Sequence, residues 1–106
     1  MEHLNRVELR GVVGRIKREK VGDGEVARIS LGVDYSYEGA VGGKVKSRDW
    51  FNLLAWKSPK INFDIVTPGD IIRVVGSIRE CRYIDSECKE SSFMGIAVSE
   101  LKWEGR

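Results

Sequence analysis

The chain has 106 residues, of which 42% are hydrophobic and 32% are charged, and its formal net charge is +2. This length predicts one domain with one hydrophobic core, and this composition argues against intrinsic disorder. No apolar run approaches the roughly 20 residues that span a bilayer, and the N-terminus lacks the apolar stretch of a secretory signal. We therefore expect a cytoplasmic protein that has no membrane partner.

Hydrophobic residues alternate with polar ones along most of the chain, and a period of two predicts β-strands. The pattern Val21–Gly24 is typical of a tight hairpin turn, and residues 38–44 are typical of a longer glycine-rich loop. Residues 83–93 are polar around 85–87 and predict a projecting hairpin. The five predicted strands span residues 5–16, 26–34, 46–57, 71–83 and 93–103.

One segment, Ser58–Val66, is predicted to be helical, because Ser58 suits a helix N-cap and Pro59 suits the first helical position. Glycines inside the predicted strands indicate bulges or tight bends, which a short sheet needs to close into a barrel. These glycines are Gly11, Gly14, Gly32, Gly76 and Gly95. The elements together predict an all-β fold, a five-stranded Greek-key barrel of the OB type with one short helix between strands 3 and 4. We expect residues 1–106 to form a single domain.

The sequence offers no convincing catalytic constellation. Residues 22–27 have the G-x-G-x-x-A spacing of a dinucleotide site, but a strand follows where that site requires a helix. The one histidine, His3, lies near the N-terminus and leaves no obvious base for a serine or cysteine nucleophile. Cys81 and Cys88 match no zinc-binding spacing and are predicted to be free thiols. We therefore expect a protein that is not an enzyme and that has no metal ligands and no cofactor.

Aromatic and basic residues are interleaved on the third predicted strand. Trp50 and Trp56 have the same parity and therefore project from one face. Exposed indoles can stack nucleobases at roughly 1–3 kcal/mol per base, and Lys46, Arg48 and Lys57 bracket them as a groove for a nucleic-acid backbone requires. The opposite face of this strand is apolar too. A second interpretation therefore stays open, in which the helix or another subunit covers the tryptophans.

Tyrosines end two other predicted strands. Tyr37, with Tyr35, ends the second strand, and Tyr83 ends the fourth beside Arg79 and Arg82. Such tyrosines either cap the edge of a core with the hydroxyl in water or add to a stacking surface. The residues themselves leave both interpretations open.

Five segments, in unchanged order over about residues 5 to 103, resemble the bacterial single-stranded DNA-binding protein (SSB) family. The segment from Asn5 to Gly14 resembles the family's N-x-V-x-L-x-G-x-x-G, and Val26 to Leu31 resembles its V-A-N-F-S-L-A strand. The run that begins at Asp49 is similar to E-W-H-R-V-V-L-F. Residues 68–79 and 96–101 are similar to K-G-x-x-V-x-I-E-G-x-L-R and V-V-V-N-E-M.

The resemblance implies an OB-fold that binds single-stranded DNA without catalysis, in replication, recombination or repair, and that associates with the nucleoid. Trp50 and Trp56 fall where the family stacks bases. Tyr37 and Tyr83 fall where it commonly has tryptophan, and three arginines fall at basic positions that approach the phosphates. The predicted nucleic-acid-binding residues are therefore Trp50, Trp56, Tyr37, Tyr83, Arg6, Lys46, Arg48, Arg79 and Arg82.

The sequence also departs from the family pattern. Asn52 stands where arginine is usual and Cys81 stands at a commonly basic position, so we expect fewer phosphate contacts. Phe51 replaces a histidine at the family's subunit contacts, which leaves the assembly state open between the family's tetramer and a dimer. The sequence ends at Arg106, without the family's linker and acidic tail, which points to a shortened form, a specialised paralogue or a mobile-element protein.

Two alternatives to DNA binding stay open. Primosomal replication proteins resemble the SSB family without its tail, so the chain is alternatively an adaptor that mainly contacts replication proteins. A third interpretation is an enzyme or an oligosaccharide-binding protein, because sugars also stack on aromatic residues.

Overall fold

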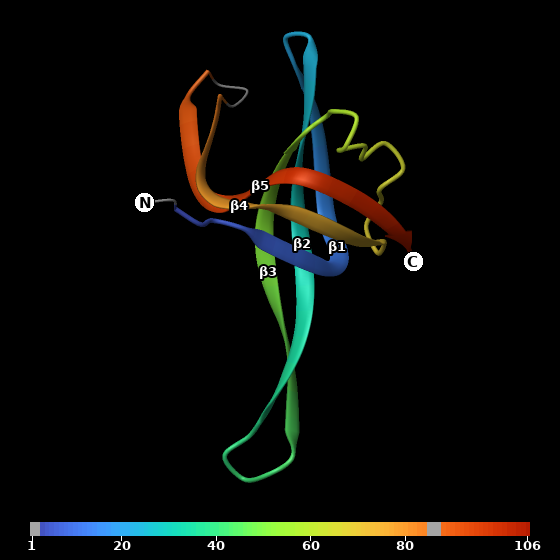
Figure 1. Ribbon diagram of the computed structural model, residues 1–106, viewed down its shortest axis with the longest axis vertical. Coiled ribbons are helices and arrows are strands. Elements are labelled where there is room, and N and C mark those ends of the chain that lie inside the picture. The colour runs from blue at the N-terminus through green and yellow to red at the C-terminus, as the bar shows by residue number, and fades with distance from the viewer. Residues whose placement is uncertain (1–2, 85–87) are drawn as a thin grey trace.

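The computed structural model describes residues 3–84 and 88–106, and of Tyr83 and Ile84 it describes only the backbone. Five strands form a closed barrel in the order β1-β2-β3-β5-β4, in which β4 pairs back onto β1 (Figure 1). Neighbouring strands are antiparallel except β3 and β5, which are parallel. The strands are β1 (Val7–Val21), β2 (Gly24–Glu38), β3 (Lys44–Trp56), β4 (Ile71–Ile84) and β5 (Glu90–Gly105). The prediction of an all-β, five-stranded barrel of the OB type is confirmed.

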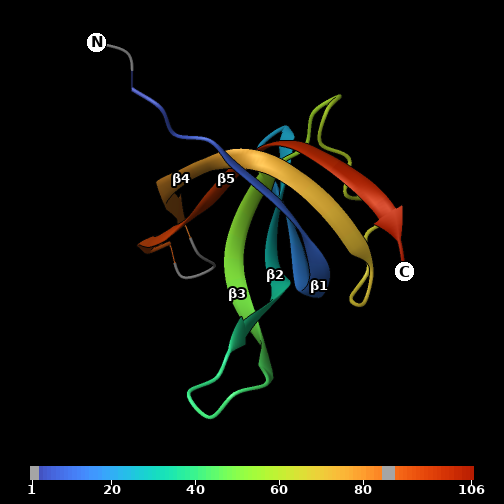
Figure 2. The ribbon, with the colours of Figure 1, turned by 60° about the horizontal axis from the view of Figure 1, so that its bottom comes forward.

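The hairpin turns fall where the sequence predicts them. Gly22 and Asp23 alone connect β1 to β2, and Gly22 has a φ of 59°, which a residue with a side chain rarely adopts. The glycine-rich loop connects β2 to β3. These two strands stay paired as far as Glu38 and Lys44, so residues 34–48 project from the barrel as a two-stranded arm. Figures 1 and 2 show this arm extending away from the other strands.

The hairpin predicted for residues 83–93 is formed by β4 and β5, whose pairing extends to Ile84 and Glu90. The residues at the predicted tip, Asp85, Ser86 and Glu87, lie outside the described residues. Figure 2 shows that this hairpin and the arm leave the barrel in different directions.

The inward-facing residues of the strands form one core. Their spacing along the strands follows the predicted period of two, but β2 and β3 also bury the outward-facing Val26 and Leu54, in a second cluster. Three further buried side chains come from the connection between β3 and β4. The fully buried core residues are Val13, Ala27, Ile29, Leu31, Leu53, Ala55, Ile61, Phe63, Val66, Ile72, Val74 and Ile96.

The helix predicted at Ser58–Val66 is wrong, because this segment forms turns and one isolated bridge between Ser58 and Ile61. Ile61 and Phe63 are both buried against the barrel. In a helix, two residues at this spacing point about 200° apart, so both could not face the same core. Burial of both side chains therefore outweighs the N-cap signal.

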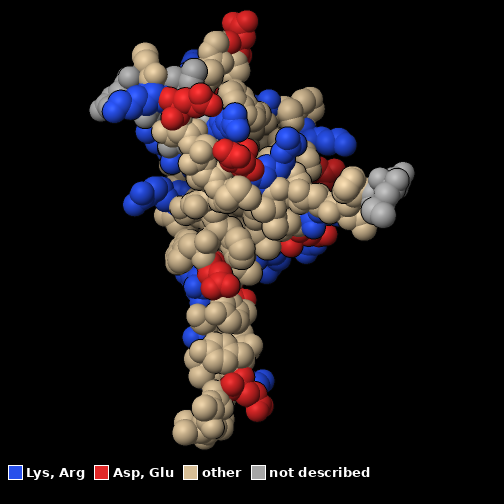
Figure 3. Space-filling view, turned by 90° about the vertical axis from the view of Figure 1, so that its left-hand side faces the viewer, with Lys and Arg blue, Asp and Glu red and all other residues tan. Residues whose placement is uncertain are grey.

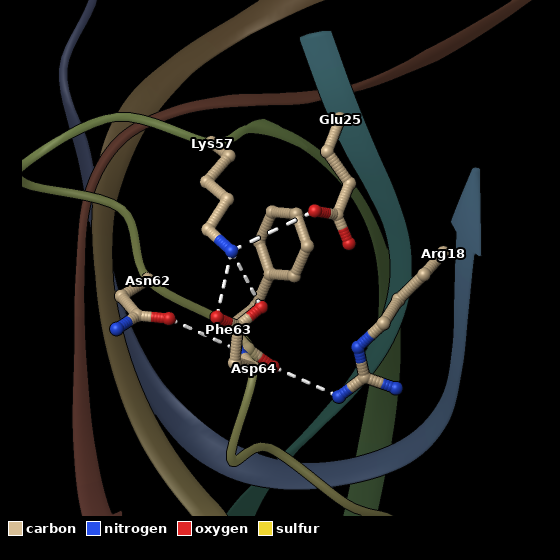
Figure 4. A network of polar contacts seen from close by, with 6 residues as sticks. All are labelled: Arg18, Glu25, Lys57, Asn62, Phe63 and Asp64. Atoms are coloured by element: carbon tan, nitrogen blue, oxygen red, sulfur yellow. Dashed lines mark hydrogen bonds and ion pairs between the residues drawn. The ribbon is translucent and has the colours of Figure 1, made fainter. Parts of the chain in front are cut away.

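The connection between β3 and β4 is attached to the barrel by Arg18 of β1. Its Nη2 donates hydrogen bonds to the carbonyl oxygens of Phe63 at 2.8 Å and Val66 at 2.5 Å (Figure 4 shows the first). In the turn the Phe63 carbonyl also accepts the Val66 backbone N–H at 3.1 Å. The guanidinium adds a second donor to that carbonyl and supplies a donor to the Val66 carbonyl. Arg18 thereby holds Phe63 over one end of the barrel.

Two of the glycines predicted as bends coincide with irregularities of the sheet. The β1–β2 register shifts between Val13 and Arg15, at Gly14, and the β4–β5 register shifts between Val75 and Gly76.

The part of the chain that the structure describes contains no helix with the length and hydropathy that crossing a bilayer requires.

Candidate nucleic-acid interface

The outer face of β3 carries two exposed tryptophans. Trp50 is 54% exposed and Trp56 is 47% exposed. They are six residues apart on the same face, a separation of about 20 Å along an extended strand. Phe51, Leu53 and Ala55 point to the core side of the barrel, and the tryptophans point away from it. The structure thus keeps both indoles accessible within one chain.

Trp50 lies directly on the backbone of the neighbouring strands. A Cβ added at Gly14 of β1 would lie 2.4 Å from Trp50 Cζ3, and one added at Gly32 of β2 would lie 3.0 Å from it. Only glycines at these two positions leave room for the ring. Arg48 lies two residues before Trp50 on β3, and its guanidinium carbon is 5.6 Å from the Trp50 ring centroid.

The surface between the two tryptophans is covered by the β4–β5 hairpin. Cys81 of β4 and Phe93 of β5 pack on Val26 and Leu54, which are the outward-facing residues there. Within one chain, the hairpin covers the centre of this face of β3 and leaves the indoles uncovered at either side. Burial raises the pKa of the Cys81 thiol, and both cysteines are free, as predicted.

A groove crosses the outer surfaces of β1, β2 and β3 beside the hairpin, and we call it the transverse groove. Its lining includes three cationic side chains, two polar ones and one aromatic ring, and the guanidinium carbon of Arg28 lies 5.9 Å from the Phe93 ring centroid. Its main lining residues are Arg15, Lys17, Arg28, Ser30, Asn52 and Phe93.

Sequence reasoning missed the cations and the ring of the transverse groove. The signal for the cations was present, because a two-residue turn at Gly22 and Asp23 fixes the register of β1 against β2. That register pairs Lys17 with Arg28 and Arg15 with Ser30, all on the outer face. Phe93 had no such signal, since its position depends on how the distant hairpin folds over the barrel.

The predicted basic residues of β3 lie on the arm. Arg48 and Lys46 share the outer face with Trp50, in line with the prediction. Arg48 is paired with Asp34, its cross-strand neighbour, through Nε–Oδ1 at 2.5 Å and Nη2–Oδ2 at 3.1 Å. This hydrogen bonding lowers the pKa of the Asp34 carboxyl and raises the pKa of the Arg48 guanidinium.

Lys57 points away from Trp56. Its Nζ lies 2.6 Å and 2.7 Å from the two carboxylate oxygens of Asp64 and 3.6 Å from Glu25 Oε2, and it sits over the Phe63 ring (Figure 4). The hydrogen bond to Asp64 raises the pKa of Lys57. This ammonium therefore belongs to the closed end of the barrel and not to the surface beside the tryptophans.

Of the predicted tyrosines, Tyr37 does not share a surface with Trp50. Tyr37 lies on the opposite face of the arm and stacks on Tyr35, with ring centroids 6.0 Å apart and planes inclined by 25°. The backbone of Tyr83 pairs with Ser91 in the β4–β5 hairpin, and its side chain lies outside the described residues. The face of the arm visible in Figure 3 carries few charged side chains.

The three remaining predicted arginines are dispersed. Arg79 is exposed and stands two residues before Cys81 on β4, so it lies on the same hairpin face as Cys81. Arg82 lies on the other face of the hairpin, near Glu80 at 3.6 Å and Glu90 at 3.9 Å. Arg6 lies in a shallow depression elsewhere on the barrel. That depression is lined by Glu8, Pro59, Lys60, Arg73, Val75, Glu100, Leu101 and Lys102.

Of the predicted residues, the structure therefore places Trp50, Trp56, Lys46 and Arg48 on the outer face of β3, with the transverse groove beside it. Over residues 3–84 and 88–106, no three His, Cys, Asp or Glu side chains converge as metal ligands would. The geometry provides stacking surfaces and cations.

The five-stranded barrel with the two projecting hairpins places the chain in the OB class of folds. No family model and no curated protein matches the sequence.

Solved structures do share the fold. A Plasmodium falciparum SSB, solved in complex with single-stranded DNA, aligns over 98% of this chain and 97% of its own, with a TM-score of 0.76 and 18% identity. A small single-stranded DNA-binding protein from Streptomyces coelicolor aligns over 98% and 96%, with a TM-score of 0.68 and 15% identity. The protein PriB from Ralstonia solanacearum aligns over 96% and 100%, with a TM-score of 0.65 and 12% identity. At these identities the likeness shows a common fold.

Proposed function

We propose that the chain binds single-stranded DNA without catalysis, by stacking bases and contacting phosphates. The observation that carries the proposal is the placement of two exposed indoles, Trp50 and Trp56, on one outer face beside the transverse groove with its three cations. Bases stack on indoles with little sequence preference, and cations attract the phosphates between them. Two of the solved structures with this fold are described as single-stranded DNA-binding proteins, which supports the proposal.

The predicted site residues have different proposed roles. Trp50 and Trp56 stack bases, while Lys46 and Arg79 contact phosphates together with the cations of the transverse groove. Arg48 supplies its charge at the edge of the Trp50 surface, where it is paired with Asp34. Tyr37 extends the surface where a strand passes around the arm, and Tyr83 stacks a base at the hairpin. Arg6 and Arg82 contact phosphates at the periphery.

The cellular setting is part of the same proposal. We infer a role in replication, recombination or repair, a location in the cytoplasm with the nucleoid, and assembly into a homo-oligomer. The exposed apolar side chains Ile78 and Met94 on the outside of the hairpin support assembly, because exposed apolar patches commonly mark protein contacts.

The decisive experiment is a tryptophan-fluorescence titration with oligo-dT and with duplex DNA of equal length, at low and high salt. We expect the single strand to quench the fluorescence strongly and the duplex to quench it little. Salt should weaken binding with a log–log slope of about −0.7 for each phosphate neutralised. An absence of quenching from the folded protein would overturn the proposal, and insensitivity to salt would favour a sugar ligand.

A second candidate function is an adaptor that mainly contacts replication proteins. The specific observation that favours it is the apolar pair on the hairpin, since Ile78 is 54% exposed and Met94 is 67% exposed. A pull-down from nuclease-treated lysate tests it. Retention of a replication protein, together with weak oligo-dT binding, would support this second function over the first.

A further inference from the structure

The cation beside Trp50 is already paired with a carboxylate. Asp34 and Arg48 are directly opposite each other on β2 and β3, and the pair is bidentate. Both side chains are accessible, with 68% of Asp34 and 43% of Arg48 exposed. Exposed ion pairs contribute little to folding, because solvent screens them. The pairing therefore matters chiefly for what the guanidinium presents to a ligand.

The pair lies at the edge of the stacking surface. The Arg48 guanidinium carbon is 5.6 Å from the Trp50 ring centroid, and Gly14 and Gly32 support the ring from beneath. The carboxylate neutralises the guanidinium, and it would also repel a phosphate that approached this end of the arm. A base stacking on Trp50 brings no such charge.

Resting on the proposed function, we infer that Asp34 is a specificity-determining residue, which keeps Arg48 paired so that the Trp50 end of the surface selects bases over phosphates. A single strand offers a base to the indole and keeps this contact. A duplex keeps the faces of its bases stacked inside the helix, so none is free to stack on Trp50, and its phosphates gain nothing from a neutralised arginine. Asp34 thus increases the discrimination between single-stranded and duplex DNA.

The matched substitutions are Asp34→Asn and Asp49→Asn. Both remove one negative charge, but Asp49 lies on the opposite face of the same two strands. We expect D34N to raise duplex affinity at low salt about three- to tenfold, to steepen its salt slope by about 0.9, and to raise oligo-dT affinity less than twofold. The ratio of single-strand to duplex affinity therefore falls in D34N and stays at the wild-type value in D49N.

The contribution of Arg48 is tested by adding D34N to Arg48→Gln. In that background no cation is left at this position for a phosphate to contact, so the steepening of the duplex salt slope should disappear. An unchanged affinity ratio in D34N, an equal change in D49N, or a steeper slope that survives in the R48Q background would overturn the inference. A wild-type protein that fails to prefer oligo-dT would instead overturn the proposed function itself.

Discussion

The two exposed tryptophans differ in what supports them. Trp50 is fixed from below by the backbone at Gly14 and Gly32, whereas Trp56 makes only ordinary contact with Gly24, 3.4 Å from a Cβ added there. A ring that is already held in place loses less conformational freedom when a base stacks on it. Trp50 is therefore the better organised of the two stacking surfaces.

Replacing either tryptophan by alanine should weaken oligo-dT binding by roughly 1–3 kcal/mol. Both rings lie outside the core, so the midpoint of urea unfolding should stay close to that of the wild type. Fluorescence anisotropy with a labelled oligo-dT measures the affinity of Trp50→Ala and Trp56→Ala. Ile65→Ala, which shortens an exposed apolar side chain in the β3–β4 connection, is the control. Wild-type affinity in a tryptophan variant would remove that tryptophan from the site.

The glycine beneath Trp50 provides an independent test of the same surface. Gly14→Ala places a Cβ within 2.4 Å of the ring, so the indole must move from its present position. We expect a loss of oligo-dT affinity similar to that of W50A, together with a shift in tryptophan emission. Because both changes act on one ring, the double variant should bind no more weakly than W50A alone. Additive losses would mean that Gly14 acts through the barrel instead.

The strands could be predicted from the sequence because alternation is a local signal that burial of one face enforces. The register between strands places Arg28 beside Lys17, and it places Tyr37 on the face of the β2–β3 pair that is opposite to the face of Trp50. Parity within a single strand does not reveal either placement. The segment Ser58–Val66 could not be predicted in this way. Its local N-cap signal favours a helix, but its conformation depends on Arg18 of a distant strand and on burial of Phe63 in the barrel.

Removing Arg18 should therefore loosen the connection between β3 and β4. Arg18→Gln cannot reproduce both hydrogen bonds to the carbonyls of Phe63 and Val66, and hydrogen bonds from a charged donor contribute about 1.5–3 kcal/mol each. We expect a loss of about 2–4 kcal/mol in unfolding free energy by urea denaturation, with oligo-dT affinity of the folded protein unchanged. Lys20→Gln, at an exposed position of the same strand, is the control. Equal stability of R18Q and K20Q would contradict this role.

A buried carboxylate, Asp70, lies just before β4 and links segments that are far apart in the sequence. It accepts hydrogen bonds from the Thr67 backbone N–H at 2.9 Å, the Thr67 hydroxyl at 3.1 Å, Trp103 Nε1 at 3.0 Å and Arg106 Nε at 3.2 Å. These bonds connect the β3–β4 connection to the end of β5 and to the C-terminal residue. The Thr67 backbone N–H first, and then Trp103, lower the pKa of Asp70 to about 2.

Because the pKa of Asp70 is lowered on folding, the stability of the barrel depends on pH. The folded state binds the Asp70 proton more weakly than the unfolded state does, in which the carboxyl has its ordinary pKa of 3.8. Its stabilisation is therefore complete above about pH 5 and is lost as the pH falls towards the folded pKa. Asp70→Asn should lower the thermal midpoint at pH 7 and make the decline between about pH 4 and pH 2 shallower than in the wild type. Thermal unfolding followed by circular dichroism across this pH range measures both effects, and D49N is the exposed control. If the plot of thermal midpoint against pH for D70N runs parallel to that of the wild type, Asp70 does not link these three segments.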